Sequence, residues 1–178
     1  MVASNATDSA QKIAAPSDHV CESPDACVDC LASSTLAGEM TQAQVGGLFK
    51  IAKIIRLSKG EVLIAQGEFD GPLFVIAKGQ FEVARAEAGA SRVSLGTLGP
   101  GMMVGELAFL GGTKRTATVT SLADAGCVLA IQREDVEAML RTDPLLVYRV
   151  MRAILRSAAM TVHDMNSGFV DSIRYIQG

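Results

Sequence analysis

One segment of the chain carries residue types that can bind a phosphate and a sugar side by side. It runs from Gly105 to Arg115, between stretches rich in Val, Ile and Leu. Gly105 allows the backbone to turn closely, and residues 107–110 can then form one short helical turn. The backbone amides at the start of such a turn point outward at the positive end of its dipole. We therefore expect an anion site there.

Two charged side chains indicate which anion this would be. Arg115 can return to the same point and add a planar, permanently charged group suited to phosphate. Glu106 lies beside the site, where a phosphate would repel it unless it accepts hydrogen bonds from hydroxyl groups, which a sugar supplies. The combination predicts a nucleotide site. The alternative is that Glu106 and Arg115 form a partly buried ion pair in a domain that binds nothing.

Short apolar runs separated by glycine turns surround this segment and predict antiparallel strands. The expected strands are residues 51–57, 62–65, 73–77, 81–85, 93–98, 102–105, 116–121 and 127–131. Many short strands at nearly even spacing are typical of a sandwich or barrel and not of alternating strand–helix units. We predict an α+β fold in which an antiparallel β-roll, a jelly-roll-like barrel, encloses the nucleotide.

Helical patterns flank these strands. Apolar spacing predicts one or two short helices between residues 36 and 49 and another over 133–141. Asp143 and Pro144 resemble the N-cap and first turn of a long helix, which we expect to end or kink at Gly168. Its apolar stripe fits packing on another helix across a two-fold axis, or packing on its own domain. The stripe consists of Val147, Met151, Ile154, Ala158, Val162 and Met165.

Composition divides the chain into three expected parts. Residues 1–34 form a mobile, acidic leader that contains three of the four cysteines, residues 35–142 form the β-roll with its flanking helices, and residues 143–178 form the long helix. The net charge of −3 and the absence of Trp disfavour a broad nucleic-acid surface. The chain has neither an export signal nor an apolar run long enough for a membrane span, so we expect a cytoplasmic protein.

The candidate segment resembles the phosphate-binding cassette of the cyclic nucleotide-binding domain family. That cassette reads Gly-Glu-Leu-Ala, a short loop, then Arg, a small residue and Ala, and this chain has Gly105-Glu106-Leu107-Ala108 and Arg115-Thr116-Ala117. Lys59-Gly60-Glu61 matches a second motif of the family. Lys114 stands where the kinase-type cassettes usually have Pro. The resemblance covers roughly residues 40–165 and implies N-terminal helices, a short cassette helix and C-terminal helices that act as a lid or dimer contact.

The resemblance also implies a role for each cassette residue. Glu106 would accept a hydrogen bond from the ribose 2′-hydroxyl. Arg115 would pair with the cyclic phosphate, helped by the amides of Leu107 and Ala108, and Thr116 would place its hydroxyl near the base. The expected ligand is cAMP, with cGMP as the second choice. We expect binding without hydrolysis, because the chain shows no catalytic constellation.

The long helix is the expected output of such a sensor. Thr161 falls where the bacterial catabolite activator has a helix threonine that reaches the adenine amino group, and a plain surface threonine is the alternative. Relatives in that branch continue into a winged helix-turn-helix where this chain stops, so we expect no DNA binding by the chain itself. Movement of the helix would instead signal to a partner protein or a second copy through residues 144–165.

The cysteines support a rival hypothesis. Cys27 and Cys30 have the spacing of metal ligands, Cys21 precedes them, and Cys127 lies on a late strand. A related branch of oxygen-sensing regulators, the fumarate and nitrate reduction regulators, holds a [4Fe–4S] cluster with clustered N-terminal cysteines and one distant cysteine. The alternatives are therefore an iron–sulfur, zinc or thiol redox sensor, four reduced thiols, or an interaction module without a ligand.

Overall fold

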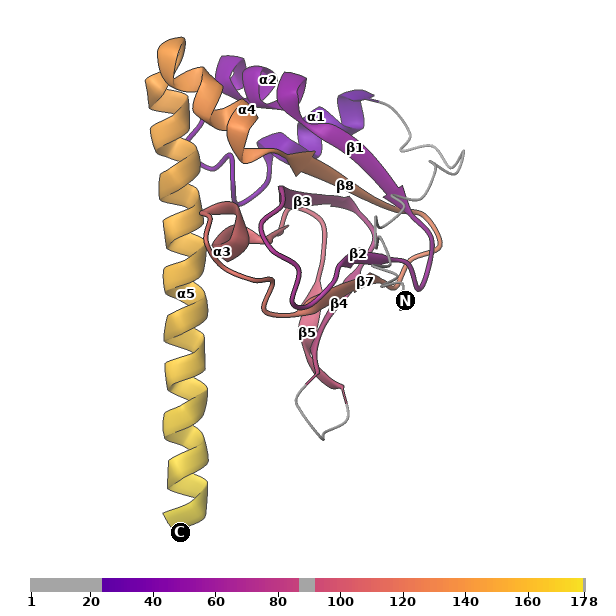
Figure 1. The fold of residues 1–178 in the computed structure, drawn as a ribbon, viewed down its shortest axis with the longest axis vertical. Coiled ribbons are helices and arrows are strands. Elements are labelled where there is room, and N and C mark those ends of the chain that lie inside the picture. The colour runs from indigo at the N-terminus through magenta and orange to yellow at the C-terminus, as the bar shows by residue number, and fades with distance from the viewer. Residues whose placement is uncertain (1–23, 87–91, 178) are drawn as a thin grey trace, which may run out of the picture.

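The strands form two four-stranded antiparallel sheets in the computed structural model, which describes residues 24–86 and 92–177 (Figure 1). The strand order is β1-β8-β3-β6 in one sheet and β2-β7-β4-β5 in the other. The strands are β1 (Lys53–Leu57), β2 (Val62–Ile64), β3 (Leu73–Lys78), β4 (Phe81–Arg85), β5 (Val93–Leu98), β6 (Met103–Val104), β7 (Thr118–Ser121) and β8 (Gly126–Ile131). The predicted α+β fold with an antiparallel β-roll is confirmed, and each expected strand lies within two residues of its predicted bounds.

Side chains that alternate along the strands fill the inside of the β-roll. β8 pairs with both β1 and β3 and is buried at every residue, because helices cover one face of this sheet and the barrel interior covers the other. The interior cluster consists of Leu57, Ile64, Phe74, Ile76, Phe81, Val119, Val128 and Ala130. Complete burial of one such side chain contributes about 1.5–3 kcal/mol.

Helices cover the outer face of the β1–β8–β3 sheet. They are α1 (Pro24–Ala32), α2 (Gln42–Ile51), α4 (Arg133–Ala138), the 3₁₀ turn η1 (Met139–Arg141) and the start of α5 (Pro144–Gln177). A capping box between Thr41 and Gln44 begins α2. Leu146, Val150 and Ile154 of α5 are buried in the cluster between helices and sheet, so the first turns of α5 belong to the same core as the strands.

Two expected boundaries are wrong. The ordered part was expected to begin near residue 35, but Cys27 and Leu31 of α1 are 0% exposed and lie in the core. These apolar positions sit in a short acidic helix, where the cysteines suggest metal ligands more strongly than core residues. The long helix continues past Gly168 to Gln177, because an interior glycine costs a helix only about 1 kcal/mol. Residues 1–23, with Cys21, lie outside the described part of the chain.

The predicted apolar stripe of α5 divides into two parts. Val147 and Ile154 are buried against their own domain, whereas Val162 is 58% exposed. Figure 1 shows α5 passing α3 and continuing beyond the β-roll. The first part therefore packs on its own domain, and the side chain of Met165 lies outside the described ones. Among the described residues, no helix combines the length and apolar character that a membrane crossing requires.

Candidate functional site

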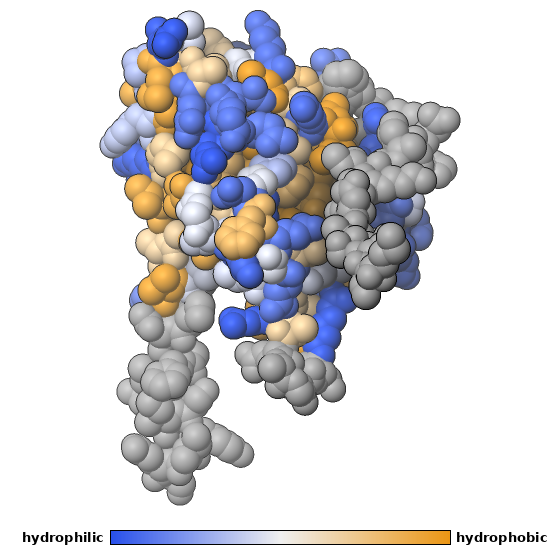
Figure 2. Space-filling view, viewed as in Figure 1, coloured by the Kyte–Doolittle hydropathy of each residue, from blue (hydrophilic) through white to orange (hydrophobic). Residues whose placement is uncertain are grey.

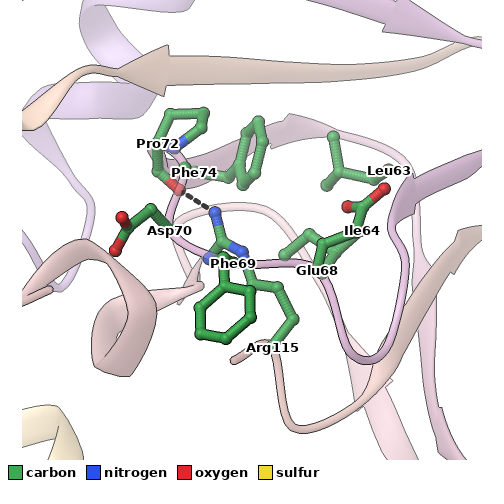
Figure 3. A pocket seen from close by; sticks show the side chains of 9 residues that line it. Leu63, Ile64, Glu68, Phe69, Asp70, Pro72, Phe74 and Arg115 are labelled. Carbon is green, nitrogen blue, oxygen red and sulfur yellow. Dashed lines mark hydrogen bonds between the residues drawn. The ribbon is translucent and has the colours of Figure 1, made fainter. Parts of the chain in front are cut away.

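Arg115 is a charged side chain buried at the edge of the β-roll, with only 6% of its surface exposed. Its Nη1 donates a hydrogen bond to the carbonyl of Gly105 at 2.9 Å, and its Nη2 donates to the carbonyl of Pro72 at 2.8 Å. Figure 3 shows the second of these bonds. The guanidinium group thus joins the cassette to the loop between β2 and β3. A guanidinium has five N–H donors, so these two bonds leave others for a ligand.

Two glycines make room for this guanidinium group. A Cβ atom at Gly71 would lie 2.5 Å from Nη2 of Arg115, and one at Gly105 would overlap Nη1. Both glycines have positive φ angles, +113° at Gly71 and +93° at Gly105, which other residues rarely adopt. The backbone conformation and the position of Arg115 therefore both favour glycine at these two positions.

The surroundings of Arg115 shift its pKa in opposite directions. Burial lowers the pKa below its ordinary value, and the negative charges of Glu68, Asp70 and Glu106 oppose this shift. The guanidinium carbon also lies 5.8 Å from the centre of the Phe74 ring, within the range of a cation–π interaction. Because the ordinary pKa of arginine is so high, the group stays charged and can attract an anion.

A cavity of about 370 Å³ opens beside Arg115 (Figure 3). Small-molecule sites usually measure about 300–1,000 Å³, so its volume suits one small ligand. The cavity is lined by Leu63, Ile64, Glu68, Phe69, Asp70, Gly71, Pro72, Phe74 and Arg115. Phe69 is 68% exposed, and the Lys114 ammonium group lies 4.9 Å from the centre of its ring. An aromatic side chain therefore remains accessible at the cavity.

The predicted helical turn is present as α3 (Glu106–Phe109), which begins directly after Gly105. The amide of Phe109 donates to the carbonyl of Gly105, as the first full turn of a helix requires. The amides of Leu107 and Ala108 come before this bond, so the turn itself provides them with no acceptor.

Glu106 is turned toward α5. The hydroxyl of Ser157 donates a hydrogen bond of 2.6 Å to Oε1 of Glu106, and Glu106 is not among the residues that line the cavity. Ser157 is not predicted from the sequence, because a serine on the polar side of a long helix carries no signal of a distant partner. The ion pair between Glu106 and Arg115, which was the alternative to a nucleotide site, is not present in the structure, where Arg115 bonds backbone carbonyls instead.

The remaining predicted residues do not line the cavity. Thr116 is exposed directly after Arg115, and Ala117 is half-buried. Thr161 is exposed on α5, and its Oγ1 donates to the carbonyl of Ser157 in the same helix at 3.1 Å. The structure therefore brings Gly105 and Arg115 together, and it does not bring Thr161 to the cavity.

The β2–β3 loop is a second part of the site that the sequence does not predict. The amide of Arg115 donates to the carbonyl of Glu68 at 2.7 Å, and the amide of Gly67 donates to the carbonyl of Arg115 at 2.9 Å. Asp70 has a φ of +53°, a left-handed conformation that Asp tolerates better than most residues. The run Asp70-Gly71-Pro72 signals a turn, but a turn signal alone does not show which segment it meets.

The predicted cysteine site is not assembled by the described residues. Among them, no group of three or more His, Cys, Asp or Glu side chains could hold a metal ion. Cys27 and Cys127 are buried in the core between helices and sheet, and Cys30 donates from its Sγ to the carbonyl of Ile76 at 3.3 Å. These three cysteines therefore act as small core residues and a helix–sheet contact in this structure.

Comparison with known families agrees with this geometry. The model of the cyclic nucleotide-binding domain matches residues 54–143, which include the cassette, Arg115 and the β2–β3 loop. The chain belongs to the cyclic nucleotide-binding domain family, a family of regulatory binding domains.

Several known proteins are similar to this chain. The cyclic AMP receptor protein of Thermus thermophilus is 30% identical over 98 residues, which are 55% of this chain and 45% of that protein. A cGMP-dependent protein kinase of Eimeria tenella is 24% identical over 106 residues, 60% of this chain and 10% of that protein. The matched segment thus spans less than half of these relatives. The solved N-terminal domain of a transcriptional regulator from Streptomyces coelicolor A3(2) is 25% identical with a TM-score of 0.67, covering 76% of this chain and 94% of that one.

Proposed function

We propose that this chain is a cyclic nucleotide sensor that binds cAMP, or cGMP, in the cavity beside Arg115 without hydrolysing it. One observation carries the proposal: a buried guanidinium group stands at a cavity of nucleotide size and bonds backbone carbonyls in place of a carboxylate. A buried guanidinium group that donates hydrogen bonds to neutral carbonyls keeps its charge and further N–H donors for an anion. Membership of the family favours a cyclic phosphate as that anion.

Different residues of the cassette would bind different parts of the ligand. Arg115 and the amides of Leu107 and Ala108 would bind the cyclic phosphate, and Glu106 would accept from the ribose hydroxyl. Thr116, exposed beside Arg115, would face the base. The similar proteins include a cyclic AMP receptor protein and cGMP-dependent protein kinases, so both nucleotides are tested, with cAMP as the first choice and cGMP as the second.

We further propose that α5 transmits the signal to a partner protein or to a second copy of the chain. Large apolar side chains are exposed along this helix. They are Leu145, Tyr148, Leu155, Met160 and Val162. Figure 2 shows hydrophobic surface along the edge of the molecule where α5 lies. Several water-exposed apolar side chains on one helix favour contact with another surface. Light scattering with and without nucleotide tests whether the second copy is the partner.

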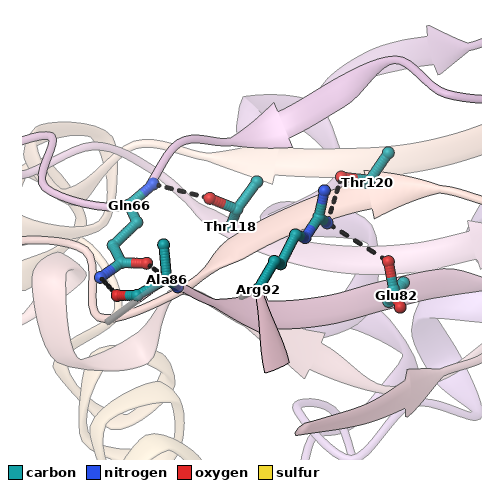
Figure 4. Close-up of polar contacts among 6 residues, drawn as sticks. All are labelled: Gln66, Glu82, Ala86, Arg92, Thr118 and Thr120. Atoms are coloured by element: carbon teal, nitrogen blue, oxygen red, sulfur yellow. Dashed lines mark hydrogen bonds and ion pairs between the residues drawn. The ribbon is translucent and has the colours of Figure 1, made fainter. Parts of the chain in front are cut away.

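Isothermal titration calorimetry with cAMP and cGMP tests the proposed binding. We expect Arg115→Ala to lower the affinity at least about a hundredfold, because both the charge and its hydrogen bonds to the phosphate are removed. The matched control is Arg92→Ala, which removes an exposed guanidinium that bonds Glu82 and Thr120 on the β-roll surface (Figure 4). The control should bind as the wild type does. Equal affinities of wild type and Arg115→Ala would refute the proposal.

A further inference from the structure

We infer that Ser157 is a positioning residue that holds Glu106 away from the cavity, so that the docked position of α5 and the binding of a nucleotide oppose each other. This inference rests on the proposed function, since it concerns the carboxylate that would accept the ribose hydroxyl. The hydroxyl of Ser157 on α5 would then set the direction of the Glu106 carboxylate at the sugar end of the site.

The contact between Ser157 and Glu106 has the geometry of a strong hydrogen bond. The distance of 2.6 Å lies within the range of a hydroxyl donating to an ionised carboxylate. Such bonds to charged groups are stronger than those between neutral groups. Glu106 is the first residue of α3, a helix of only four residues, so little else fixes the direction of its side chain. The orientation of the carboxylate therefore follows the position of α5.

The position of Ser157 is set by its neighbours on α5. Arg152 forms an ion pair of 3.2 Å with Glu39 in the segment between α1 and α2, and Arg156 pairs with the other oxygen of the same carboxylate. Ile154 is fully buried one turn before Ser157. Beyond Ser157, the side chains of α5 from Ala159 to His163 are all exposed. Ser157 thus lies where α5 leaves the domain. At this point the helix has few buried side chains to fix its position.

Binding of a ribose at Glu106 would disturb this contact. The carboxylate must turn toward the cavity, and Ser157 must then either lose its acceptor or move with it. Linkage requires this effect to be reciprocal. The hydrogen bond between Ser157 and Glu106 weakens nucleotide binding by a certain factor, and a bound nucleotide weakens that hydrogen bond by the same factor. The sensor and its output helix would therefore be coupled through one hydrogen bond.

The experiment compares Ser157→Ala with Ser157→Thr, which keeps the hydroxyl. Calorimetry should show about tenfold tighter binding of cAMP by Ser157→Ala, equivalent to about 1.4 kcal/mol, and near wild-type affinity for Ser157→Thr. Hydrogen exchange of residues 150–163 supplies a second measurement. In the wild type the nucleotide should speed exchange there, whereas Ser157→Ala should exchange fast already without nucleotide. Ser33→Ala is the matched control, because its hydroxyl bonds only carbonyls of its own helix end, those of Asp29 and Cys30.

The outcomes separate this inference from the proposed function. Binding by Ser157→Ala that is weaker than, or within twofold of, the wild type would overturn the inference and leave the proposed function intact. The inference would also be overturned, and the proposed function left intact, if hydrogen exchange of α5 were the same with and without the Ser157 hydroxyl. Absence of binding by the wild type would overturn both. Tighter binding by Ser157→Ala, with Ser157→Thr and Ser33→Ala unchanged, would support both.

Discussion

The two charged residues of the cassette are held in opposite ways. Arg115 is buried, bonded to two backbone carbonyls and enclosed by two glycines, so its position is built into the β-roll. Glu106 lies on a short helix and is held by one hydroxyl of α5. The anion end of the site is thus fixed before a ligand arrives, whereas the sugar end depends on a helix that extends beyond the domain. Affinity and signalling would then reside in different residues.

After the substitution of Arg115 itself, the largest expected effect comes from disturbing the position of its guanidinium group. In Gly71→Ala the new Cβ would lie 2.5 Å from Nη2 of Arg115, and the three nearest atoms all belong to that flexible side chain. The guanidinium group, and not the backbone, must therefore move. We expect cAMP affinity measured by calorimetry to fall at least about tenfold, together with about 1–3 kcal/mol of unfolding free energy for the positive φ angle.

Gly60→Ala separates these two effects. Gly60 also has a positive φ, +85°, but a Cβ there would meet nothing within 4 Å. This control should lose a similar unfolding free energy in urea and keep the affinity of the wild type. If Gly71→Ala binds cAMP as well as Gly60→Ala does, the position of Arg115 is not the fixed feature that we describe.

The same contrast explains what the sequence could predict. The strands and the turn at α3 follow from local patterns, because residue type and spacing determine each of them, and the same patterns mark Glu106 and Arg115 as candidate site residues. The carbonyl of Pro72 and the hydroxyl of Ser157 come from segments 43 and 51 residues away from their partners. A carbonyl is common to all residues and a helical serine is unremarkable, so only the folded structure shows which ones complete the site.

A smaller effect is expected from weakening the docking of α5 at Glu39. Glu39→Gln removes ion pairs with Arg152 and Arg156, which are partly exposed and therefore contribute only up to about 1 kcal/mol. If docked α5 opposes binding, cAMP affinity should rise about threefold at low salt, and the difference from the wild type should shrink in 1 M NaCl. Glu82→Gln is the control, since it removes a surface ion pair with Arg92 on the β-roll. A lower affinity of Glu39→Gln would mean that docked α5 assists the ligand.

The smallest effect is expected at Thr161, one turn beyond Ser157. Its hydroxyl is exposed and donates to the carbonyl of Ser157, so its removal costs the helix one local bond and the cavity nothing. We expect Thr161→Ala to bind cAMP and cGMP within twofold of the wild type. Thr142→Ala serves as control, because Thr142 makes a similar local bond to the carbonyl of Met139. Selective loss of cAMP binding by Thr161→Ala would instead show that α5 moves far enough to bring this hydroxyl to the adenine. The movable end of the site would then include the base as well as the sugar.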